Sequence, residues 1–131
     1  LFSRLEYFKL GISQNDSLTQ EMQEKLLSYE DSFINLSLAK NSAASEETIN
    51  RLLSLADEEL ILAIYENSAT SQEILTKAYK NSLYHEALAK NENTPIDILY
   101  QLVLDSRYER YVKTNDGYGK HIQTQNIGWL I

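Results

Sequence analysis

Two histidines and two clusters of carboxylates are the side chains here with the clearest capacity for chemistry. Histidine can act near neutral pH as a general acid, a general base or a metal ligand. His85 and His121 lie 36 positions apart, and the acidic runs are Glu46-Glu47 and Asp57-Glu58-Glu59. No third group is placed to orient a histidine or a carboxylate for proton transfer. The acids instead fall at predicted helix starts, where negative charge complements the helix dipole.

Sequence motifs of known catalytic or cofactor sites are also missing. The chain has no Gly-rich phosphate loop, no G-x-S-x-G turn and no H-E-x-x-H metal motif. It has no cysteine, so its own residues cannot form a disulfide, a thiolate metal site or an iron–sulfur cluster. We therefore predict no enzymatic activity, no catalytic residue, no bound metal and no cofactor.

Tyrosine is the residue type in excess, with nine Tyr against one Trp, and six of them lie between Tyr65 and Tyr111. Tyrosine and arginine are enriched in the hot spots of protein interfaces. Amphipathic packing, with the hydroxyl at the rim of the core, is the competing interpretation. The candidate partner-binding residues, all at or near predicted second-helix positions, are Tyr65, His85, Glu109, Arg110 and Lys113.

Composition narrows the classes of partner and the location. The chain of 131 residues fits one domain, and its hydrophobic fraction of 43% supports a folded core. Its net charge of −7 repels phosphate backbones and anionic lipid, so neither nucleic acid nor a membrane is an expected partner. No apolar run reaches the roughly 18 residues of a spanning helix, and we predict a cytoplasmic protein. A start at Leu1 rather than Met indicates a processed protein or a fragment.

A periodic asparagine organises the chain. The recurring residues are Asn15, Asn41, Asn67, Asn91 and Asn115, at spacings of 26, 26, 24 and 24. A period of 20–50 residues is typical of stacked-repeat architectures. We predict a single repeat domain over 1–131. Its repeats are 15–40, 41–66, 67–90 and 91–114, with 1–14 as an N-terminal cap or partial repeat and 115–131 as a C-terminal cap or truncated repeat.

Each predicted repeat begins with helix-capping signals. Thr70-Ser-Gln-Glu73 has the form of a capping box. In the fourth repeat we expect Thr94 to cap the helix and Pro95 to take the first helical position. Ala44 occupies the equivalent of Thr94 in the second repeat, so the cap there is lost or has moved to Ser45.

Apolar residues at i, i+3 and i+4 then predict a first helix, and pairs four apart predict a shorter second helix. The second-helix pairs are Ile34 and Leu38, Leu60 and Ile64, Tyr84 and Leu88, and Tyr108 and Val112. The recurring asparagine follows this second helix, where left-handed geometry is common. Its amide can also bond backbone groups of the loop, which predicts a structural ladder of asparagines.

The fourth repeat resembles the leucine-rich repeat variant (LRV) family. The residues that carry the resemblance are Asn91-Glu-Asn-Thr-Pro95, Ile98-Leu99, Leu102, Asp105 and Val112. The third repeat matches more loosely and the first two weakly, and Glu92 stands where the family has proline. The resemblance implies a right-handed α-solenoid, akin to HEAT arrays, with α-helices alternating with shorter helices that are sometimes 3₁₀.

Three functions follow as hypotheses. The first is a non-enzymatic scaffold that binds another protein in its superhelical groove. The second is a small acidic neutralising protein, of the immunity or antitoxin kind, that binds a basic partner through electrostatic steering. The third is nucleic-acid binding on a HEAT-like frame, which the local cluster of Lys80, Lys90, Arg107, Arg110 and Lys113 suggests and the overall charge opposes.

Overall fold

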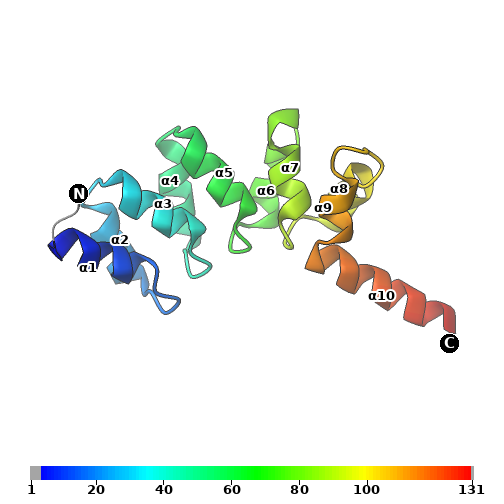
Figure 1. The fold of residues 1–131 in the computed structure, drawn as a ribbon, viewed down its shortest axis with the longest axis horizontal. Coiled ribbons are helices and arrows are strands. Elements are labelled where there is room, and N and C mark those ends of the chain that lie inside the picture. The colour runs from blue at the N-terminus through cyan, green and yellow to red at the C-terminus, as the bar shows by residue number, and fades with distance from the viewer. Residues whose placement is uncertain (1–3, 131) are drawn as a thin grey trace. The chain divides into compact units, whose positions relative to one another are not determined.

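The structure, a computed structural model, describes the backbone of residues 4–130 and the side chains of residues 8–125. Within this range the chain forms α-helices and one 3₁₀ helix, and no β-strand, which confirms the predicted all-α class (Figure 1). No helix in the described range is both long enough and apolar enough to cross a membrane. The apolar residues of the predicted C-terminal cap, Ile127, Trp129 and Leu130, have side chains outside the described set.

The chain divides into two compact units, Leu1–Ala69 and Thr70–Ile131, which we describe separately. The first unit contains α1 (Arg4–Ser13), α2 (Gln20–Leu27), α3 (Ser32–Lys40), α4 (Glu46–Ser54) and α5 (Glu58–Glu66). Helix α3 packs against all four of the others. Its Ile34 and Leu38 are buried with Ile49, Leu52 and Ile64, so one face of each helix forms the core.

The second unit begins with α6 (Gln72–Ala78), the 3₁₀ helix η1 (Ser82–Tyr84) and α7 (His85–Lys90). It continues with α8 (Ile96–Leu102), α9 (Glu109–Lys113) and α10 (Asp116–Leu130). Helix α7 packs against α6, α8 and α9, and α10 packs against α8 and α9. Leu75, Leu88, Leu99 and Val112 form its buried core. A continuous right-handed solenoid through both units stays a prediction.

The first helix of each predicted repeat starts one residue later than expected in the last two cases. Ser71, not Thr70, caps α6 by accepting from the backbone N–H of Ile74 at 3.3 Å. Pro95 precedes α8 rather than opening it, and its helix has no side-chain cap bond. Thr94 does not cap, because its buried hydroxyl donates to the carbonyl of Leu88 at 2.7 Å.

In the first three repeats the cap therefore belongs to the fourth position after the asparagine, where Thr19, Ser45 and Ser71 serve. The alternative in which the cap of the second repeat moves to Ser45 is confirmed, since Ser45 accepts from the N–H of Thr48 at 3.2 Å. Such a cap stabilises a helix by about 1 kcal/mol.

The second helix or turn of each repeat begins at an aspartate or asparagine, and of these the sequence analysis placed only Asp57 at a helix start. Asp31 and Asp57 accept from the first N–H groups of α3 and α5, and Asn81 does so for η1. Asp105 accepts from the N–H of Arg107 at 2.9 Å in the turn before α9. In the two longer repeats the residue before the aspartate has a positive φ, 51° at Glu30 and 54° at Ala56.

The periodic asparagines form the predicted ladder but not in the predicted backbone conformation. Asn41, Asn67 and Asn91 have φ near −82° and ψ between 120° and 124°, which is extended rather than left-handed. Extended backbone carries the chain straight out of the second helix. Each side-chain Oδ1 can then accept the N–H two residues later, at 2.8 Å in both Ala43 and Asn93.

In Asn41, Asn67 and Asn115 the side-chain Nδ2 donates to the carbonyls of the preceding asparagine and of the residue two before it, within the same unit. Asn41 donates to the carbonyls of Ser13 and Asn15 at 2.9 and 2.8 Å. Asn115 does the same to Ala89 and Asn91, at 2.9 and 2.8 Å. These amides are buried and hydrogen-bonded, as buried polar groups in proteins generally are.

Candidate interaction surface on α7 and α9

A tyrosine flanked by cations marks the junction of α7 and α9 in the second unit. The guanidinium of Arg110 lies 4.7 Å from the ring centroid of Tyr111, and its Nη2 donates to the Tyr111 hydroxyl at 2.8 Å. The Nζ of Lys90 lies 4.7 Å from the same centroid. Cation–π contacts at exposed sites contribute about 0.5–1 kcal/mol each. They favour the arrangement in which both cations lie against the Tyr111 ring.

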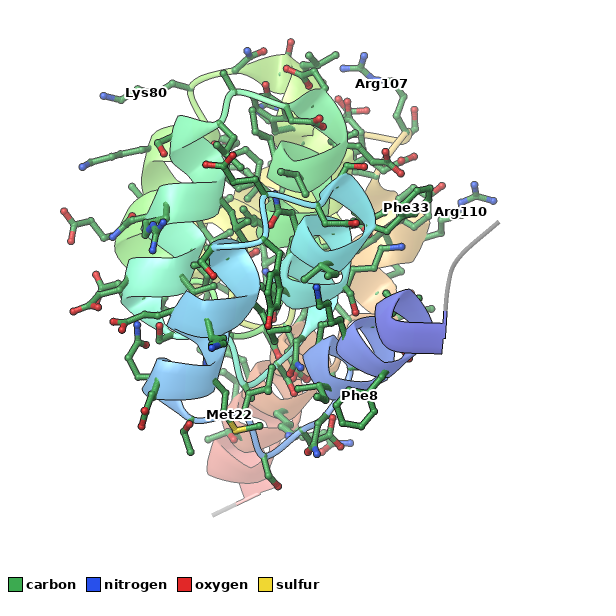
Figure 2. The ribbon with its side chains drawn as sticks, turned by 90° about the vertical axis from the view of Figure 1, so that its left-hand side faces the viewer. Phe8, Met22, Phe33, Lys80, Arg107 and Arg110 are labelled. Carbon is green, nitrogen blue, oxygen red and sulfur yellow. The ribbon has the colours of Figure 1, made fainter. Side chains whose placement is uncertain are left out.

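The other charges on α7 and α9 are paired along their own helices. Lys113 lies 2.6 Å from Glu109, whose hydrogen bond and charge raise the pKa of Lys113. Lys90 lies 3.6 Å from Glu86. Among the residues with described side chains, the ion pairs do not include Arg110. Arg110 is exposed and projects away from the helices (Figure 2), so its charge can meet a partner's carboxylate.

His85 sits in an aromatic stack beside this surface. Its ring stacks on Tyr79 at 4.7 Å between centroids and meets the edge of Tyr108 at 6.0 Å. Its Nε2 hydrogen-bonds the carbonyl oxygen of Tyr79 at 2.8 Å, which requires the tautomer protonated at Nε2. One ring nitrogen of His85 is hydrogen-bonded and the ring is half-buried. His85 therefore packs within the aromatic stack and is poorly placed to act as a base.

Arg107 and Asp105 extend the same surface along the turn before α9. They form an ion pair at 2.8 Å, and the guanidinium lies 5.1 Å from the Tyr108 ring. The hydrogen bond from the Arg107 side chain, followed by that from its backbone N–H, lowers the pKa of Asp105 to about 2. Asp105 is therefore ionised at neutral pH, and it restrains Arg107 at the edge of the aromatic stack.

Tyr65, the fifth predicted partner-binding residue, lies on α5 in the first unit and is half-buried. Burial raises its pKa, and the Glu58 carboxylate adds to the rise. The structure places the other four predicted residues on α7 and α9 of the second unit. A single groove that includes Tyr65 stays a prediction.

Sequence inspection missed the aromatic members Tyr79 and Tyr111. A signal for Tyr111 was present, because equivalent positions of the other repeats carry the small residues Ser37, Ala63 and Ala87. The Tyr111 side chain is too large to fit where the other repeats have serine or alanine at this position. It extends far enough to contact the two cations. No comparable signal marks Tyr79, whose contact with His85 depends on the turn at η1.

No group of three or more His, Asp or Glu residues within the described part of the chain could hold a metal ion. His121, the second histidine, lies on α10 with its ring 5.6 Å from that of Tyr100. Comparison of the chain with protein-family models, curated proteins and solved structures gives no significant match. The resemblance to the LRV family therefore stays a prediction.

Proposed function

We propose that this protein is a non-enzymatic helical-repeat scaffold that binds another protein. In this proposal the predicted repeats stack as a right-handed solenoid, and the surface on α7 and α9 contributes the contact residues. A cytoplasmic location belongs to the same proposal. The observation that carries it is the Lys90–Tyr111–Arg110 cluster, a tyrosine held by two cations at the protein surface.

Two properties of this cluster support the proposal: the types of its residues and the contacts that restrict their side chains. Tyrosine and arginine offer large contact area and directional hydrogen bonds, and they dominate the energy of many interfaces. Side chains already fixed by mutual contacts lose less entropy when a partner binds. Arg110 has the further property of a charge outside the ion pairs of its helix, which favours a partner with a carboxylate opposite it.

The direct test is capture of partners from host cells by the full chain, followed by mass spectrometry and by binding measurements with the captured protein. Arg110→Ala and Tyr111→Ala should each weaken binding by about tenfold or more. Lys77→Ala is the matched control, because Lys77 is an exposed lysine on α6 that pairs only with Glu73 among the ion pairs described. Undiminished binding by both variants, with helical content unchanged, would refute this surface.

One observation favours the alternative function, an acidic neutralising protein that binds a basic partner. Residues 1–69 contain 12 Asp and Glu against 5 Lys and Arg, a net charge of −7, whereas residues 70–131 contain seven of each. The whole excess of negative charge therefore falls in the first unit. A field of one sign accelerates association with an oppositely charged partner.

Ionic strength separates the two functions. An acidic neutraliser should lose association rate steeply as salt rises from about 0.05 to 0.5 M, since screening shortens the range of the field. Glu58→Gln with Glu59→Gln should slow its association further. A partner bound through Arg110 and Tyr111 should instead be insensitive to this pair of substitutions, and it should dissociate faster from Tyr111→Ala.

A further inference from the structure

Two apolar positions near the N-terminus are open where the equivalent positions one period later are buried. Phe8 and Ile34 are equivalent by the 26-residue period, and their exposed fractions are 66% and 3%. Met22 and Thr48 are likewise equivalent, at 37% and 0%. Figure 2 shows Phe8 on α1 and Met22 on α2, both on the near face of the first unit. Two large apolar side chains are thus exposed where the next repeat buries their counterparts.

Helix α2 packs against both α3 and α4, the two helices that carry Ile34 and Thr48. Its Gln23 accepts from the Thr48 hydroxyl at 2.7 Å and from the Ser45 N–H at 2.9 Å. The corresponding pair one period earlier is α1 and α2, and the described residues place no helix across that pair. The fold therefore indicates what kind of element fits there, namely a short amphipathic helix.

The open positions form a groove of about 340 Å³ between α1 and α2. Ile12 and Leu26 line it together with Phe8 and Met22. Apolar pockets of this kind, ringed by polar groups, are typical of binding sites. The groove is open to solvent, although the buried side chain of Leu26 lines it.

The rim of the groove carries positive charge on the acidic half of the chain. Lys9 and Lys25 line it against one carboxylate, that of Glu21. The Nζ of Lys9 lies 3.7 Å from the ring centroid of Tyr29, which also lines the groove. This contact fixes the ammonium at the groove edge. A helix with acidic residues along its flank complements such a rim, whereas a basic helix would be repelled.

We propose that the groove between α1 and α2 docks an amphipathic helix of a partner protein. The apolar face of that helix packs on Phe8, Ile12 and Met22, and its acidic flank pairs with Lys9 and Lys25. The inference rests on the proposed protein-binding function but uses a different surface from α7 and α9. Failure at one surface is therefore distinguishable from failure at the other.

The test uses the full chain and two labelled synthetic peptides of about 16 residues, long enough for a helix of several turns. Both carry leucine at i, i+3, i+4 and i+7, and they differ in having either glutamate or lysine on the flanks. Fluorescence anisotropy should show binding of the glutamate peptide and at least about tenfold weaker binding of the lysine peptide. The Lys25→Glu variant should narrow or reverse that preference.

Phe8→Ala and Met22→Ser should each lower the affinity for the glutamate peptide by about tenfold. Both side chains are exposed enough for the variants to fold. Leu104→Ser is the matched control, because Leu104 is 80% exposed and lies in the second unit. Arg110→Ala should bind the peptide normally. The proposal is overturned by equal binding of both peptides, by no binding at about 1 mM, or by a concentration-dependent dimer that Phe8→Ala abolishes.

Discussion

The Nδ2 atom of Asn67 donates a hydrogen bond of 2.9 Å to the carbonyl oxygen of Asn41, which lies 26 positions earlier. The same amide donates to the carbonyl of Ala39 at 2.8 Å. Its Oδ1 accepts the N–H of Ala69 at 2.9 Å. One buried side chain thus joins the ends of two successive helix pairs in the first unit and shapes the loop that follows.

Replacement of Asn67 by alanine should destabilise the protein by about 2–4 kcal/mol. The change removes three hydrogen bonds and leaves buried carbonyls without their donors. Urea denaturation followed by circular dichroism measures the effect. Asn15→Ala is the control, because Asn15 is exposed and its Oδ1 bonds the N–H of Ser17. We expect Asn15→Ala to lower the free energy of unfolding by less than about 1 kcal/mol. An equal loss of stability in the two variants would contradict a structural ladder.

Gln23 and Thr48 should be energetically coupled. Gln23 is 2% exposed and makes four hydrogen bonds, one of them with the Thr48 hydroxyl. Gln23→Leu introduces the residue type found at this position in the third and fourth repeats, yet it should cost about 1–3 kcal/mol of stability through unpaired polar groups. Thr48→Ile should recover part of that loss in the double variant. Strictly additive effects in a double-mutant cycle would show that the pair acts independently.

Two glycines of α10 should respond in opposite directions to alanine. A Cβ at Gly117 would stand 2.2 Å from the carbonyl oxygen of Glu92, so backbone must move. Gly117→Ala should therefore lower the free energy of unfolding by about 1–3 kcal/mol. A Cβ at Gly119 meets nothing within 4 Å, and Gly119→Ala should raise it by about 0.5–1 kcal/mol through helix propensity. Thermal denaturation of both variants checks the pair.

The carboxyl of Asp105 should titrate near pH 2 instead of the ordinary 3.8. Because the folded-state pKa is lowered, the stabilisation is present above pH 3.8 and is lost as the pH falls through about 2. Carbon-13 NMR of the side chain gives the midpoint. Arg107→Gln should move it up toward 3.8, since the main hydrogen bond comes from the Arg107 side chain. Lys113→Gln, which alters the neighbouring Glu109 pair, should leave it in place.

Sequence periodicity was enough to predict the paired helices of the repeats, but not α10 and not which polar groups face inward. Thr70 and Ser71 are adjacent and either could cap a helix by local rules. The fold buries Thr70, so the cap falls to Ser71. The prediction of left-handed backbone at the periodic asparagines was wrong for a similar reason. The carbonyls that bind their amides belong to a preceding helix pair, and only the folded chain brings them within reach.

The candidate surface was predictable where its contacts are local. Glu109 and Lys113 stand four apart, and that spacing on a helix predicts their ion pair. The position of Arg110 beside Tyr111 is likewise a sequence neighbour relationship. The approach of Lys90 to Tyr111 depends on the packing of α7 against α9, which no local pattern specifies.

The corner that leads into the second helix has a consequence for how this chain can vary in length. The two extra residues of the longer repeats fall before Asp31 and Asp57. The distance to the next ladder asparagine is ten positions in every repeat, counted from Asp31, Asp57, Asn81 and Asp105. An insertion in this turn before the second helix leaves the spacing from that helix to the next periodic asparagine unchanged. This turn is therefore the place where an epitope or sensor peptide could be grafted, and where related chains should differ most in length.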